Sequence, residues 1–120
     1  MKPAPGILLC ALTALAAFAE AIPSEDPWVG EWSAPSLSKP DVPIRISLLA
    51  GGEAKEQVGD YHGTGTWRAE DDGARIFWAS GWTGLLRRDG EGGFELVTWK
   101  KGSPAEGPPD DVQKAGRLRS

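Results

Sequence analysis

Residues 61–88 read YHGTGTWRAEDDGARIFWASGWTGLLRR, and the alternation of side chains in this stretch decides the fold. From Tyr61 onward, small or apolar residues occupy every second position, and polar residues occupy the positions between them. A period of two is typical of a β-strand with one buried face, because successive side chains of a strand point to opposite sides. The predicted buried face is Tyr61, Gly63, Gly65, Trp67 and Ala69, and the predicted solvent face is His62, Thr64, Thr66, Arg68 and Glu70.

The breaks in this alternation have the composition of tight turns. Asp71-Asp72-Gly73 precedes a strand over residues 75–79, and Ser80-Gly81 is predicted to be a two-residue hairpin loop before a strand over 82–88. Further strands are predicted over residues 28–32, 44–48 and 94–100. Consecutive hairpins predict an all-β fold, a single antiparallel meander of about six strands that forms a small barrel or a strongly curled sheet.

The chain is predicted to begin with a secretory signal peptide over residues 1–21. Lys2 supplies a positive charge, residues 7–15 are almost purely apolar, and Ala19 and Ala21 offer two cleavage positions. The apolar run is shorter than the ~20 residues that cross a bilayer, and the sole cysteine, Cys10, would leave with the signal. These features predict a secreted or periplasmic protein that lacks disulfides and does not span a membrane.

The rest of the chain divides by composition into three parts. Residues 22–27 form a short polar leader, residues 28–101 carry the predicted strands, and residues 102–120 are rich in proline and glycine. The last part has few large apolar side chains, so it is predicted to be an extended or disordered tail draped along the domain. A single β domain over residues 28–101 is therefore expected.

Two short motifs resemble those of small exported lipocalin-like proteins. One is WVGEW at residues 28–32, and the other is GTGTW at 63–67, which leads into DGARIFW at 72–78. The resemblance implies a barrel in which a Gly-x-Trp on the first strand plugs one end, with Trp32 as the plug and Trp67 as its counterpart. Barrel inhibitors of secreted bacterial metalloproteases share this start, but they carry a disulfide that this chain cannot form.

Six tryptophans are many for a domain of this size. A buried indole removes ~150–250 Å² from water, so most of the tryptophans are predicted to form the core. Trp67 lies on the predicted buried face, and it and Trp32 are the first candidates for core positions.

The hairpin over residues 75–88 differs from the others because both of its faces are apolar. A two-residue loop would place Ile76, Trp78 and Leu85 on one face and the aromatic residues at 77 and 82 on the other. A one-layered barrel buries only one face, so the second face is predicted to point outward as a binding surface, unless the leader or the tail covers it. The predicted binding residues are Phe77, Trp82, Leu86, Arg75 and Arg88.

Composition argues against nucleic-acid binding and against catalysis. The net formal charge of −4 does not favour contact with phosphate backbones or anionic membranes. The one histidine, His62, lies on the predicted solvent face, where it forms no nucleophile–base pair, and a single histidine cannot bind zinc. The loop DGEGG at residues 89–93 is predicted to be a turn rather than a calcium site. No catalytic residue, metal or cofactor is therefore predicted.

The predicted function is binding without catalysis. An exported module would recognise a small apolar ligand or an extracytoplasmic protein through the aromatic face of the hairpin. Two alternatives remain open. One is an inhibitor of an extracytoplasmic enzyme, with the leader inserted in the target's cleft, and the other is carbohydrate binding by an exposed indole.

Overall fold

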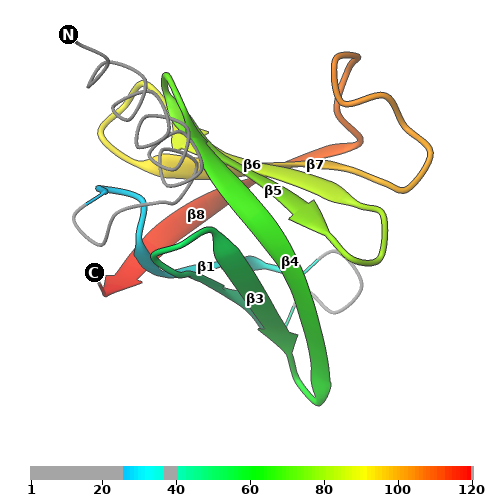
Figure 1. Ribbon diagram of the computed structural model, residues 1–120. Coiled ribbons are helices and arrows are strands. Elements are labelled where there is room, and N and C mark those ends of the chain that lie inside the picture. The colour runs from blue at the N-terminus through cyan, green and yellow to red at the C-terminus, as the bar shows by residue number, and fades with distance from the viewer. Residues whose placement is uncertain (1–25, 37–40, 120) are drawn as a thin grey trace, which may run out of the picture.

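The computed structural model describes residues 26–36 and 41–119, and every regular element in these ranges is a β-strand (Figure 1). The predicted signal peptide and most of the predicted leader lie outside the described residues. The described part of the chain contains no helix that could cross a membrane. The strands are β1 (Gly30–Pro35), β2 (Pro43–Leu48), β3 (Glu53–Val58), β4 (Tyr61–Glu70), β5 (Gly73–Trp78), β6 (Thr83–Arg88), β7 (Phe94–Trp99) and β8 (Asp111–Arg119).

Each strand pairs antiparallel with the next one along the chain, and β8 pairs with β1, so the sheet closes into a barrel. This topology confirms the all-β antiparallel meander, and of the two predicted closures it is the barrel that forms. In Figure 1 the last strand, β8, lies beside the first, β1. The barrel has eight strands, two more than predicted.

The two additional strands, β3 and β8, carry polar residues on the face that points into the barrel. Glu56 of β3 lies directly opposite the core residue Ile46, and Gln113 of β8 lies directly opposite the core residue Leu96. Direct cross-strand partners point to the same side, so both polar side chains point inward. On its outer face β8 exposes Val112. The usual alternation is thus weak on β3 and inverted on β8, and neither strand could be recognised from it.

The prediction for the tail over residues 102–120 is corrected accordingly. Residues 111–119 form β8, so the domain continues beyond residue 101. The connection over residues 100–110 lies along the outside of the barrel at Trp99, whose indole N–H donates to the Gly107 carbonyl at 3.0 Å. Trp99 lies on the outer face, opposite Thr83, and is nevertheless only 5% exposed. The tail therefore covers part of the outer surface and closes the barrel.

Aromatic side chains fill one end of the barrel, which we term the closed end. The rings of Trp28 and Trp32 stack with centroids 5.3 Å apart, and Phe94 meets Trp32 edge-on at 4.8 Å. Arg117 of β8 lies over Trp32, with its guanidinium carbon 4.3 Å from the ring centroid. Trp32 and Trp67 are both buried, as predicted for core residues.

The hairpin between β5 and β6 has a three-residue loop, residues 79–81, where a two-residue loop was predicted. The Trp78 N–H donates to the Trp82 carbonyl at 3.0 Å, and Gly81 adopts a φ of +99°, which glycine tolerates without strain. The extra loop residue shifts the pairing by one and turns every side chain of β6 to the opposite face. Leu86 is consequently 0% exposed, inside the barrel, whereas Phe77 stays on the outer face at 39%.

Candidate ligand site

The end of the barrel opposite the closed end holds a cavity of about 390 Å³, which we term the mouth cavity. This volume lies within the range of small-molecule sites, which are mostly apolar clefts with a few polar groups. It is lined from strands all around the barrel, including β2, β3, β5, β6, β7 and β8. Its main apolar lining consists of Ile44, Val58, Trp78, Trp82, Gly84 and Leu96.

Two tryptophans from the β5–β6 hairpin line the mouth cavity. Trp78 and Trp82 face each other across the loop, and both are half-buried. The indole N–H groups of Trp32, Trp67 and Trp99 donate to backbone carbonyls at 2.9–3.1 Å. Those of Trp78 and Trp82 have no acceptor among the described residues. These two indoles therefore have both ring surface and an N–H available for a ligand.

A glycine on β6 provides the space in front of the Trp78 indole. A Cβ atom at Gly84 would lie 3.7 Å from Trp78 Nε1 and 3.5 Å from Leu96 Cδ1, both ordinary contact distances. A longer side chain at this position would extend into the mouth cavity. The volume of the cavity thus depends on residue 84 having no side chain.

One carboxylate, that of Glu56, faces the mouth cavity from β3. Gly63 of β4 leaves room for it, because a Cβ atom at position 63 would lie 2.6 Å from Glu56 Oε2 and 3.0 Å from Tyr61 Oη. The carboxylate and the phenol are therefore neighbours. Burial raises the pKa of Glu56 above its ordinary value of 4.5. No residue in the described ranges forms an ion pair or a hydrogen bond with this carboxylate.

β8 brings a second acidic group to the same end of the barrel. Asp111 lies directly opposite Thr98, which lines the mouth cavity, as does Gln113. The Oδ2 atom of Asp111 is buried and accepts no hydrogen bond from the described residues. No described lysine or arginine lines the mouth cavity. Glu56 is consequently the one charged side chain in the described lining, and the Asp111 carboxylate lies nearby, opposite Thr98.

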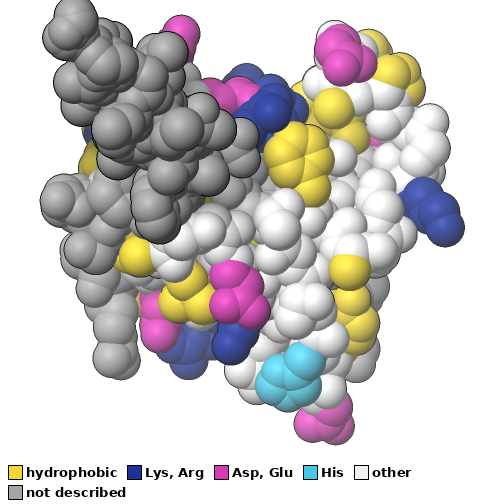
Figure 2. Space-filling view, viewed as in Figure 1, with side chains coloured by type: hydrophobic (Ala, Val, Ile, Leu, Met, Phe, Trp, Pro, Cys, Tyr) yellow, Lys and Arg dark blue, Asp and Glu magenta, His cyan; other side chains and the backbone are white. Residues whose placement is uncertain are grey.

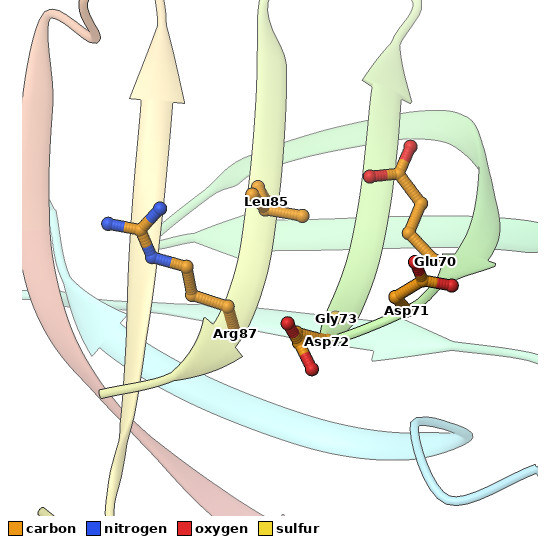
Figure 3. A pocket seen from close by; sticks show the side chains of 6 residues that line it. All are labelled: Glu70, Asp71, Asp72, Gly73, Leu85 and Arg87. Atoms are coloured by element: carbon orange, nitrogen blue, oxygen red, sulfur yellow. The ribbon is translucent and has the colours of Figure 1, made fainter. Parts of the chain in front are cut away.

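A larger hollow of about 530 Å³ lies on the outer surface beside the turn between β4 and β5. Its charged side chains point in different directions, as Figure 3 shows for Glu70, the two aspartates of the turn, and Arg87. Glu70 pairs with Arg75 at 2.8 Å, and this hydrogen bond lowers the pKa of Glu70. Arg87 pairs with Glu95 at 2.6 Å. Glu70 and Arg87 are thus held by other parts of the chain, and the charged groups of this hollow do not converge on one ligand position.

At the closed end a smaller hollow of about 210 Å³ is bordered by two arginines. The guanidinium carbon of Arg88 lies 5.6 Å from the ring centroids of both Trp28 and Phe94. Arg117 donates to the Val29 carbonyl at 3.1 Å, and burial, followed by the charge of Arg88, lowers the pKa of Arg117. Both arginines pack against the chain itself, and Arg117 ties β8 to the segment that precedes β1.

The structure separates the five residues that were predicted to form one binding face. Trp82 lines the mouth cavity, Leu86 belongs to the core, and Arg88 lies at the closed end. Phe77 and Arg75 point outward from β5, where an ion pair at 2.8 Å holds Arg75. Only Trp82 of the predicted set contributes to the mouth cavity.

Sequence reasoning did not identify the cavity residues Glu56, Tyr61, Trp78 and Gln113 as a site. One signal was present on β3, where Ala54, Glu56 and Val58 occupy alternate positions. A carboxylate that shares a strand face with two apolar residues is a candidate for burial, and buried acids are frequent at functional sites.

The outer surface offers no comparable site on the face shown in Figure 2. Hydrophobic side chains there form separate groups among polar and charged ones. His62 is exposed, as predicted. Among the described residues there is also no cluster of histidine, cysteine, aspartate or glutamate that could hold a metal ion.

In comparisons with protein-family models, curated proteins and solved structures, nothing matches this chain.

Proposed function

We propose that this chain is an exported, non-catalytic binding protein that holds a small ligand with an apolar body in the mouth cavity. The observation that carries the proposal is the cavity of about 390 Å³ beside Trp78 and Trp82, in a barrel whose other end is packed with aromatic rings. Closed eight-stranded barrels have interiors that are either filled by side chains or hold one small ligand, as in lipocalins. This barrel combines a filled end with an open end.

The chemistry of the lining favours binding over catalysis. The described polar groups of the mouth cavity include Glu56, Tyr61, Thr98 and Gln113, but no histidine lines it. His62, the one histidine of the chain, is exposed on the outside of the barrel. A serine or threonine paired with a histidine base is therefore missing from the described lining.

The binding site proposed here is the interior of the barrel, whereas the sequence predicted the outer face of the β5–β6 hairpin. None of the six tryptophans is exposed, so stacking of a sugar on an exposed indole has less support than enclosure of a ligand beside Trp78 and Trp82. The inhibitor alternative depends on a leader that is mostly outside the described residues. Export is proposed from the signal-peptide features of residues 1–21.

The test is binding of a neutral apolar probe, N-phenyl-1-naphthylamine, followed by its fluorescence and by calorimetry. The processed chain is expected to bind one equivalent. Gly84→Leu should abolish binding because its side chain fills the cavity, and Trp82→Ala should weaken binding about tenfold, or ~1.4 kcal/mol. Phe77→Ala, on the outer face of the same hairpin, is the matched control and should bind normally. If Phe77→Ala loses binding and Gly84→Leu binds normally, the mouth cavity is not the binding site, and the outer face of the hairpin is favoured instead.

A further inference from the structure

The mouth cavity contains an acid whose position needs an explanation if the cavity only accommodates apolar groups. Glu56 points into the barrel from the middle of β3, between Ala54 and Val58 on the same face, and burial raises its pKa. A partly buried carboxylate without a partner is unfavourable for stability, because the charged form loses part of its hydration. An apolar residue at position 56 would fill the same space without this cost.

The neighbouring strand is adapted to this carboxylate. Gly63 lies directly opposite Glu56, and a Cβ atom there would come within 2.6 Å of Oε2 and 2.9 Å of Cγ. The glycine thus leaves a recess that the glutamate side chain occupies, with the Tyr61 hydroxyl beside it. The carboxylate is held at the cavity wall, where its oxygens are available to a ligand.

No positive charge in the described lining balances the Glu56 carboxylate. Among the groups that face Glu56 from the elements around it, β2 contributes only isoleucines, β4 contributes Tyr61, and the lining residues of β5, β6 and β7 carry no charge. Asp111, at the start of β8, adds a second carboxylate with a buried oxygen that has no partner among the described residues. A ligand that enters this cavity therefore meets negative charge without a positive charge from the described lining.

We propose that the mouth cavity recognises an organic cation, a small apolar body that carries a protonated amine, with the ammonium group at Glu56 beside Tyr61. The apolar body would lie against Trp78, Trp82 and Leu96. An ammonium group forms charge-assisted hydrogen bonds to a carboxylate and is attracted to the faces of aromatic rings, so both kinds of lining residue favour it. This inference rests on the proposed function and specifies the class of ligand.

The test compares three probes of one shape by calorimetry at pH 7: 4-phenylbutylamine, 4-phenylbutanol and 4-phenylbutyrate. The amine is expected to bind at least tenfold more tightly than the alcohol, and the carboxylate more weakly than both. In Glu56→Gln the preference for the amine should disappear while binding of the alcohol is retained, which shows that the cavity is intact. Glu53→Gln removes the same charge from an exposed position of β3 and should keep the preference.

A pH series separates Glu56 from other sources of the preference. The amine stays protonated from pH 4 to 8, so the preference should grow as the pH rises through the pKa of Glu56, which lies above 4.5. If the alcohol binds as tightly as the amine, or if Glu56→Gln keeps the preference, the inference is wrong and the proposed function stands. If neither N-phenyl-1-naphthylamine nor any of the three probes binds, the proposed function fails, and the inference fails with it.

Discussion

At the scale of single residues, the mouth cavity depends on two glycines that leave space beside large side chains of the neighbouring strands. Gly63 makes room for the Glu56 carboxylate, and Gly84 leaves open the space in front of the Trp78 indole. At position 63 the Glu56 side chain of the adjacent strand occupies the space that a Cβ atom would need, whereas at position 84 a Cβ atom would make ordinary contacts and only a longer side chain would fill the cavity. The shape of the mouth cavity therefore depends on these two glycines as well as on the large side chains that line it.

Glu56→Gln is expected to stabilise the protein slightly at neutral pH. Burial raises the pKa of Glu56 in the folded state above 4.5, so the folded state binds this proton more tightly than the unfolded state does. Stability linked to this group is fully present below pH 4.5 and is lost as the pH rises through the folded-state pKa. The gain in the variant should be on the order of 0.5 kcal/mol at pH 7, because the group is partly solvated, and it should vanish near pH 4. Urea denaturation at both pH values measures it, and a variant that is less stable at pH 7 would contradict the assignment.

Two glycine-to-alanine variants on β4 should separate ligand binding from stability. In Gly63→Ala the new methyl group meets the flexible Glu56 side chain, so the barrel should fold and the amine preference should fall. In Gly65→Ala the new methyl group meets backbone atoms, namely the Phe77 carbonyl oxygen and the Trp78 Cα atom, the latter at 2.9 Å. Because backbone atoms cannot rotate away, the two strands must move apart. Gly65→Ala should therefore cost about 1–3 kcal/mol of stability. Thermal unfolding and calorimetry distinguish the two, and equal loss of stability in both variants would contradict this account.

At the scale of strands and turns, the sequence predicted those elements in which apolar residues point inward. β4 follows this rule in its middle, where Trp67 is buried as predicted, whereas Tyr61 and Ala69, at the two ends of the predicted buried face, are exposed. β3 and β8 do not, because they place Glu56, Gln113 and Arg117 inside the barrel. The strands that alternation could not reveal are the ones that bring polar groups to the interior, so the candidate site escaped prediction for the same reason as the strands.

The register of the β5–β6 hairpin escaped prediction for a different reason. Ser80-Gly81 suits a two-residue loop, and a glycine with positive φ also ends the observed three-residue loop. The choice between these loops moves Leu86 from the outer face to the core. Local turn chemistry was compatible with both registers, and packing inside the closed barrel decides between them.

The turn between β6 and β7 is expected to lose stability in acid. The Asp89 carboxylate accepts hydrogen bonds from the backbone N–H groups of Glu91 and Gly93 at 2.7 and 3.0 Å, and from Lys114 of β8 at 2.7 Å. The Lys114 hydrogen bond, followed by those from the backbone, lowers the pKa of Asp89 from 3.8 to about 2. This contribution is therefore present above pH 3.8 and is lost as the pH falls through about 2.

Asp89→Asn should accordingly lower the melting temperature at pH 7 and have a smaller effect at pH 2. Asp72→Asn, in the exposed acidic turn between β4 and β5, serves as the control and should melt like the parent protein. Thermal melts from pH 2 to 7 followed by circular dichroism test this prediction. An effect of Asp89→Asn that is equally large at pH 2 and pH 7 would show that the charge of the carboxylate is not what stabilises the turn.

At the scale of the whole molecule, the barrel has two ends with different properties. The closed end is packed with Trp28, Trp32 and Phe94 under two arginines, whereas the open end encloses the mouth cavity between half-buried indoles and a carboxylate. Tight packing and a preformed cavity are thus placed at opposite ends of the same strands. Substitutions at the closed end are then expected to alter stability, and substitutions at the open end to alter the proposed ligand binding.

Removal of β8 is expected to abolish folding. A chain that ends at Asp110 loses the pairing of β8 with both β7 and β1, and it loses the contact of Arg117 with Trp32. Two strand edges would be left open, so aggregation and a non-cooperative thermal transition are expected. Leu118→Ser, at an exposed position of the same strand, should change stability by no more than about 0.5 kcal/mol. Cooperative unfolding of the shortened chain at the parent's midpoint would contradict a closing role for β8.

The bond from Arg117 to the Val29 carbonyl joins groups 88 positions apart in the chain. Contacts of such separation form late, because the intervening polypeptide must first be restricted at a large cost in entropy. During translation the first strand has no partner on its free side until β8 has been synthesised. The barrel therefore cannot close until almost all of the described strands have been synthesised, a delay that would suit the export that we propose.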